Sequence, residues 1–203
     1  SNFSAVDSKF KMPQVWKTSL AVDYAFPTSF PFTVSVEGIF NKTINGVVLR
    51  DWSVQDPNGF ARFNGADNRL VYPKNFTYYS NINDACVLTN THKGYGYTFN
   101  ITATAEPLKN LNVMAAYTHT VMKEVSGMPG SNASSAWSGL YTINGPNFSK
   151  VQNSQYVIPD RIIANVSYKY AKEHFSLFYT GYSPSGYSFL YNGDINGDGI
   201  KND

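Results

Sequence analysis

Charged side chains, cysteine and long apolar runs are all scarce in this chain. Charged residues make up 15% of its 203 positions, against roughly 25% in an average soluble domain, and the net charge is +2. Such a chain lacks the strongly basic surface of nucleic-acid-binding proteins, so we expect no nucleic-acid partner. The one cysteine, Cys86, excludes an internal disulfide and a multi-cysteine metal site. No apolar run approaches the roughly 18 residues that a transmembrane helix needs.

Motifs of enzymatic chemistry are missing as well. The three histidines, His92, His119 and His174, are scattered through the chain. The sequence contains no H-E-x-x-H zinc motif, no G-x-S-x-G nucleophile motif and no glycine-rich phosphate loop. We therefore expect that the protein is not an enzyme.

Segments that alternate apolar and polar residues are the main positive signal. In residues 158–184 the apolar side chains of the first arm take every second position, at 162, 164, 166, 168 and 170. A period of two predicts a β-strand whose two faces meet different surroundings. A short polar turn at 171–174 separates this arm from a second alternating one. The segment is predicted to form a β-hairpin.

Two more hairpins of this kind are predicted upstream. Their strands are expected at 14–24 and 32–41, and at 94–105 and 111–120. Partial alternation over 43–52 extends the second strand. The three hairpin turns are short, whereas the connections between hairpins are long and polar, at 42–93, 121–157 and 183–203. This alternation of tight turns and long loops is typical of outer-membrane barrels, where the long loops lie outside the cell.

The charged side chains of the predicted strands all fall on the polar parity. They are Lys17, Asp23, Glu37, Arg161 and Lys169. A basic residue that faces lipid costs about 2–4 kcal/mol at the middle of the membrane, so contact with lipid would enforce this segregation. A soluble β-sandwich also alternates apolar and polar residues and is the alternative interpretation. The pattern favours an all-β membrane protein, in which an antiparallel up-and-down meander of about six strands places one face against lipid and the other toward a wet interior.

An ordered set of motifs resembles a known family. The motifs are KMPQVWKTSLAVDY (11–24), VEGIFNKTINGVVLRD (36–51), LTNTHKGYGY (88–97), DRIIANVSYKY (160–170) and YNGDINGDG (191–199). Together they resemble the C-terminal barrel region of TonB-dependent outer-membrane receptors, most closely the Oar-like branch. The resemblance covers essentially the whole chain.

This resemblance implies a location, partners and a function. It implies that residues 1–203 form a sector of one barrel domain of about 22 strands with long external loops. The chain would lie in the outer membrane of a Gram-negative cell, against lipid and against the rest of the barrel. The plug domain, the segment that contacts TonB and the closing strands are expected outside this sequence. Energised uptake of a substrate is the implied function, and a non-transport surface adhesion module is the alternative.

A candidate calcium loop lies near the end of the sequence. Asp194, Asn196, Asp198 and Gly199 match the first half of the D-x-[DN]-x-[DN]-G pattern, in which alternate side-chain oxygens converge on Ca²⁺. The remaining predicted ligands are the carbonyl of Ile200 and the side chain of Asn202. The bidentate acid of such a loop would fall at position 205, and a plain polar turn of Asp, Asn and Gly is the alternative. Ca²⁺ bound here would brace an external loop.

The long loops also carry candidate substrate-binding residues. Aromatic platforms next to arginine and aspartate can hold sugars, peptides or chelates, and packing between loops is the alternative role. The candidates are Arg62, Phe63, Asp67, Arg69 and Trp137.

Overall fold

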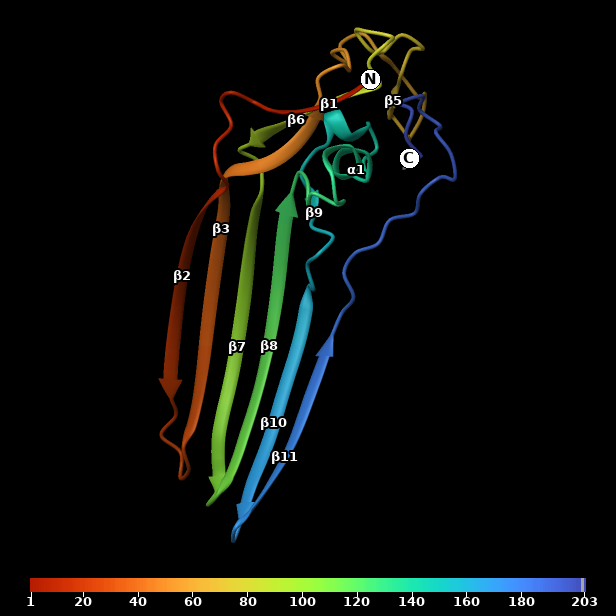
Figure 1. The fold of residues 1–203 in the computed structure, drawn as a ribbon. Helices are drawn as coiled ribbons and strands as arrows, with labels where there is room; N and C mark the ends of the chain where they lie inside the picture. The colour runs from red at the N-terminus through yellow and green to blue at the C-terminus, as the bar shows by residue number, and fades with distance from the viewer. Residues whose placement is uncertain (202) are drawn as a thin grey trace.

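The computed structural model describes residues 1–201 and residue 203. Six long strands form one antiparallel sheet, here called the long sheet, which ends in short turns at one side and in folded loops at the other (Figure 1). Each strand pairs with the next in the order β2 (Gln14–Ala25), β3 (Phe32–Asp51), β7 (Tyr95–Leu108), β8 (Leu111–Glu124), β10 (Asp160–Tyr170) and β11 (Glu173–Tyr182). The predicted meander of six strands is thus present. The described residues leave this sheet open, with β2 and β11 at its edges.

The register of the long sheet brings the apolar positions of all six strands onto one face. Val22 of β2 lies opposite Val36 of β3, and Val36 lies opposite Ile101 of β7. The row continues from Ile101 to Tyr117 of β8 and on to Ile162 of β10. We call this side the apolar face. Its central side chains are Leu20, Val22, Val34, Val36, Phe99, Ile101, Ala103, Val113, Ala115, Ile162, Ala164, Val166, Leu177 and Tyr179.

The opposite side, the polar face, carries all five charges that the sequence places there. Asp23 lies opposite Ser35, and Ser35 lies opposite Thr102, so hydroxyl groups accompany the charges. Other charges of the observed strands, however, lie on the apolar face. These are Lys42, Lys123, Asp160 and Glu173. All four lie near strand ends. The row from Val22 to Ile162 and the two rows next to it toward the short turns carry no charge, whereas the adjoining row toward the cap contains Asp160, hydrogen-bonded to His119.

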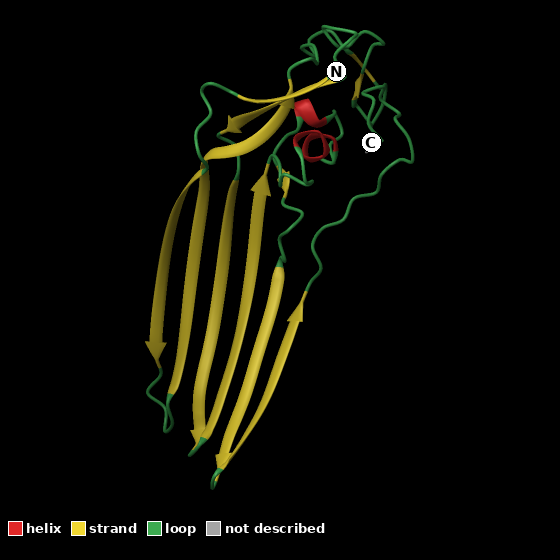
Figure 2. Cartoon of the chain, in the orientation of Figure 1, coloured by secondary structure: helices red, strands yellow, loops and turns green. Residues whose placement is uncertain are grey.

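The long sheet is a single layer without a core of its own. No other described element packs on either of its faces below the folded loops (Figure 2). Leu20 is consequently 75% exposed and Leu177 is 73% exposed, although both are large apolar side chains. None of the helices in the described part of the chain is long and apolar enough to cross a membrane.

The long connections fold into a compact cap at one end of the sheet (Figure 1). Within the cap, β6 (Asp84–Thr91) pairs antiparallel with residues 46–51 of β3, and β1 (Asn2–Val6) pairs parallel with β6. The chain therefore holds more strands than the six expected, because eleven are described, and the added pair of β1 and β6 is parallel. The remaining cap elements are β4 (Ala61–Arg62), β5 (Leu70–Val71), α1 (Ala133–Ser138), the 3₁₀ helix η1 (Pro146–Phe148) and β9 (Gln152–Asn153).

The buried apolar side chains of the described chain belong to the cap. They are Val48, Leu49, Leu70, Tyr72, Cys86, Val87, Val125, Ala136 and Leu140. One side chain, Asn147, ties three cap elements together. Its Oδ1 atom accepts hydrogen bonds from the backbone N–H of Asp51 (2.7 Å) and from Nε1 of Trp137 in α1 (2.8 Å). Its Nδ2 atom donates to the carbonyl of Asp51 at 2.6 Å. The cap is thus a folded body with its own core and polar ties.

Candidate metal centre

The C-terminal loop around DINGDG folds on itself through its own carboxylates. Oδ1 of Asp194 accepts a hydrogen bond from the N–H of Gly197 at 2.6 Å, and Oδ2 accepts from Gly199 at 2.9 Å. Oδ1 of Asp198 accepts from the N–H of Ile200 at 2.8 Å. Gly197 and Gly199 have φ angles of 83° and 85°, a left-handed conformation that glycine adopts without strain. The glycines therefore let the chain wrap around the acidic side chains.

The loop is anchored to the cap at its centre. The carbonyl of Asn196 accepts a hydrogen bond from the backbone N–H of Tyr72 at 2.7 Å, just after β5. Asn196 is 1% exposed, and its Oδ1 atom accepts from the N–H of Asp198 at 2.9 Å. A side chain at Gly197 would bring its Cβ to 3.0 Å from the carbonyl of Tyr72. The close approach of the two backbones holds the loop in place.

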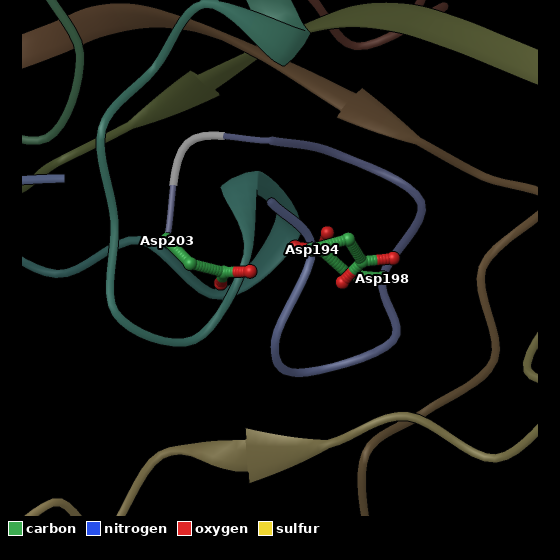
Figure 3. Close-up of side chains that lie close together, drawn as sticks. All are labelled: Asp194, Asp198 and Asp203. Carbon is green, nitrogen blue, oxygen red and sulfur yellow. The ribbon is translucent and has the colours of Figure 1, made fainter. Parts of the chain in front are cut away.

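Three carboxylates converge in this loop. One oxygen each of Asp194, Asp198 and Asp203 lies within 4.8 Å of the other two (Figure 3). Asp203 is held in place because its Oδ2 atom accepts from the N–H of Ile195 (2.7 Å) and its Oδ1 atom accepts from Nη1 of Arg69 (3.3 Å). We call these three side chains the acidic triad.

The acidic triad is a group of carboxylates that could hold a cation, and its members affect one another's ionisation. Burial raises the pKa of Asp198 to about 6, and the negative charges of Asp203 and Asp194 add to this effect. Burial and the charges of Asp198 and Asp203 also raise the pKa of the Tyr72 hydroxyl. Hard cations such as Ca²⁺ prefer carboxylate and carbonyl oxygens. A cation among these three carboxylates would offset the repulsion that now favours protonation of Asp198.

The structure brings together only some of the predicted calcium ligands. Asp194 and Asp198 come together as expected. Asn196 lies beside them, but its Oδ1 atom is engaged by the backbone, and its buried Nδ2 atom has no hydrogen-bond partner in the described chain. Ile200 is half-buried and lines a small cavity with Asp198, and Asn202 lies outside the described residues.

The sequence analysis missed Asp203, which completes the acidic triad. An acid was expected at position 205, the twelfth of the loop, whereas Asp203 is the tenth residue counted from Asp194. The available signal was the presence of this further acid close to the DINGDG motif. Spacing alone does not show that the chain turns back far enough to bring the carboxylate of Asp203 next to those of Asp194 and Asp198.

The predicted substrate-binding residues separate into two places. Arg62, Phe63, Asp67 and Arg69 belong to the β4–β5 segment, where Nη1 of Arg62 donates to the carbonyl of Asn68 at 2.7 Å. Arg69 is 7% exposed; its Nε atom lies 3.0 Å from Oδ1 of Asp67, and its guanidinium lies 5.5 Å from the ring centroid of Tyr191.

Trp137 lies apart from that segment, in α1, where its indole donates to Asn147. Arg69, a predicted substrate-binding residue, forms an ion pair with Asp203, the triad member that the sequence analysis missed. Trp137 lines the same small cavity as Asp198 and Ile200, two of the predicted calcium ligands.

No family model matches the sequence, and neither the curated proteins nor the solved structures contain a match.

Proposed function

We propose that the chain forms part of the wall and external loops of a TonB-dependent outer-membrane receptor of the Oar-like type, which takes up a substrate. The observation that carries this proposal is the apolar face of the long sheet. It spans six strands, its middle lacks charge, and no described element covers it. Burying one exposed Leu or Val side chain contributes about 1.5–3 kcal/mol, so leaving this whole face in water would be very unfavourable. In the proposed receptor, lipid covers the apolar face.

Strand length and the placement of aromatic residues support the same proposal. The six strands contain between 10 and 20 residues, whereas a tilted strand crosses a bilayer with roughly 9–11. Aromatic side chains flank the charge-free middle of the apolar face at both ends: Trp16 and Phe40 lie toward the cap, and Tyr24, Tyr168 and Phe175 lie toward the short turns. Aromatic girdles at both membrane interfaces are typical of outer-membrane barrels. In the proposed orientation the short turns are periplasmic and the cap is extracellular.

The open edges of the long sheet fit a barrel sector. The outer edges of β2 and β11 have no strand partner among the described residues. Backbone N–H and C=O groups without hydrogen-bond partners are energetically costly in hydrocarbon, so we propose that both edges pair with further strands of the same barrel. A plug domain in the lumen and contact with TonB complete the proposed transporter. The cap then carries the residues that capture the substrate from outside the cell.

The acidic triad supports a second candidate function. It would make the cap a Ca²⁺-braced binding module on the cell surface, with adhesion as its task and no transport. Both candidates contain the same metal loop, so calcium binding does not distinguish them. Contact of the apolar face with lipid is expected for the receptor and not for a soluble adhesion module.

Tryptophan quenching tests the membrane proposal directly. Trp16 lies on the apolar face, whereas Trp52 and Trp137 lie in the cap. In vesicles that contain brominated phosphatidylcholine, a variant that retains Trp16 alone should be strongly quenched. The matched variant that retains Trp52 alone, a side chain 57% exposed in the cap, should keep its fluorescence. Equal quenching of the two variants, or none for Trp16, would contradict the proposal.

A further inference from the structure

A cavity separate from the acidic triad lies where three segments of the chain meet at the cap. Its volume is about 310 Å³, at the lower end of the range for small-ligand sites. Glu124 at the end of β8 lines it together with Gln152 of β9, and the aromatic side chains Tyr141 and Tyr187 belong to its wall. The sequence analysis did not single out Glu124, Gln152 or Tyr187. We call this space the Glu124 cavity.

The Glu124 carboxyl group has no ion-pair partner among the described residues. Its Oε1 atom is buried and has no hydrogen-bond partner. This atom lies under Gly127, since a Cβ built there would be 3.1 Å from it, and the ring of Tyr156 lies against the same glycine. The ion pairs of the described residues involve Arg69 and His119 with aspartates, and none involves Glu124. Oε1 is therefore shielded from water, and the cavity gives a ligand access to the carboxylate.

The surroundings of Glu124 suit a cation with hydrogen-bond donors. The described residues that line the cavity include no lysine, arginine or histidine, so a carboxylate is its sole charged group. A shielded carboxylate oxygen without a partner is unfavourable, and an ammonium group that donates to the carboxylate offsets this. Tyr141 is 44% exposed and Tyr187 is 82% exposed, so their rings are available for cation–π contact with the same group.

A second cavity adjoins the Glu124 cavity. A neighbouring cavity of about 260 Å³ shares Tyr141, Gln152 and Ser188 with the first, and its wall includes Thr142. The Oγ1 atom of Thr142 is also buried without a hydrogen-bond partner in the described chain. Buried polar atoms without partners are rare in folded proteins and call for a specific explanation. Two such atoms beside adjoining cavities indicate a ligand longer than a single ammonium group.

We propose that the Glu124 cavity binds the primary ammonium group of a small ligand, with the Glu124 carboxylate as its counter-charge. Such a group occurs at the amino terminus of a short peptide and in a small polyamine, and both fit the same chemistry. The proposal rests on the proposed receptor function for the role of this ligand as cargo. Binding itself requires no bilayer, so it is measured separately from the membrane proposal.

Calorimetry on the full chain in detergent tests the proposal with three probes. These are trialanine, N-acetyl-trialanine and cadaverine, each titrated in the presence of excess Ca²⁺ so that the acidic triad does not compete. At least one of the two free amines should bind saturably, and N-acetyl-trialanine should bind more weakly by about tenfold or more. Trialanine binding alone identifies a peptide amino terminus as the source, and cadaverine binding alone identifies a polyamine. Binding of both shows that the ammonium group suffices.

Charge-neutral variants locate the site. Glu124→Gln keeps the shape of the side chain and should weaken binding about ten- to hundredfold, because a hydrogen bond to a charged group is lost. Glu106→Gln is the matched control, since Glu106 is exposed near the opposite end of the sheet and should have no effect. Tyr187→Ala removes an exposed cavity wall and should weaken binding without loss of folding, which thermal melting verifies. Absence of binding by both free amines, or unchanged binding by Glu124→Gln, would overturn the proposal.

Discussion

A charge placed in the middle of the apolar face should show whether that face contacts lipid. Val36 is suited to this test because it lies between Val22 and Ile101 in the central row of the sheet. The neighbouring Ser35 points to the polar face, between Asp23 and Thr102. Val36→Arg and Ser35→Arg therefore insert the same side chain one residue apart, on opposite faces.

The expected difference between the two variants is large. Arginine at the membrane midplane costs about 2–4 kcal/mol on the lipid face of a barrel. This cost corresponds to a decrease of roughly 30- to 700-fold in the folding equilibrium constant of Val36→Arg. Ser35→Arg gains a carboxylate neighbour, Asp23, across the strand pair. An exposed ion pair contributes about 0–1 kcal/mol, so this variant should fold about as well as the parent chain.

The measurement is a urea titration in phosphatidylcholine vesicles, followed by tryptophan emission and repeated in detergent micelles. Val36→Arg should unfold at a clearly lower urea concentration than the parent in vesicles, and Ser35→Arg should not. Equal destabilisation by both arginines would mean that the two faces meet the same surroundings. A greater loss for Ser35→Arg would reverse the assignment of the faces. Either outcome would refute the reasoning from the register.

Three further predictions concern the cap. The pKa of Asp198 is raised from 3.8 to about 6, so its ionised form is disfavoured in the folded state. Without Ca²⁺ the cap should therefore gain stability as the pH falls from about 6 to about 4. Thermal melts with CaCl₂ or a chelator should show stabilisation by Ca²⁺ at neutral pH, and Asp198→Asn should remove both effects. Cys86 is 1% exposed and burial raises its pKa to about 12, so a thiol reagent at about pH 8 should modify it only after denaturation. Asn147→Ala leaves the Trp137 indole and a backbone amide of β3 unpaired, which should lower the free energy of unfolding by about 1–3 kcal/mol for each buried donor and shift the emission of Trp137. Asn64→Ala, at an exposed cap position, should change neither the stability nor the emission.

Alternation in the sequence predicts the long sheet well, because every strand carries the period on its own. The two-residue repeat around Val36 or Ile162 is enough to assign a face, and consecutive short turns are enough to assign neighbours. Strand ends are predicted less well. Lys123 interrupts the apolar parity, so the sequence alone places it in a loop, whereas backbone pairing carries β8 past it to Glu124.

The cap could not be predicted in the same way. Two-residue strands and the six-residue helix α1 are shorter than the windows over which a period can be recognised. Their positions depend on contacts between distant residues. Arg69 and Asp203, which hold the acidic triad in place, are 134 residues apart in sequence. The DINGDG motif therefore predicted two members of the triad, and the third required the folded chain.

The continuity of β3 has a mechanical consequence for the cap. This strand runs unbroken for 20 residues, paired with β2 and β7 in its first part and with β6 over residues 46–51. A body that shares a paired strand with the sheet beneath it has no hinge at that junction. We therefore expect the cap to resist swinging about β3. We expect any movement that admits a ligand to occur in the irregular segments of the cap, such as the stretch after β11 that forms one wall of the Glu124 cavity.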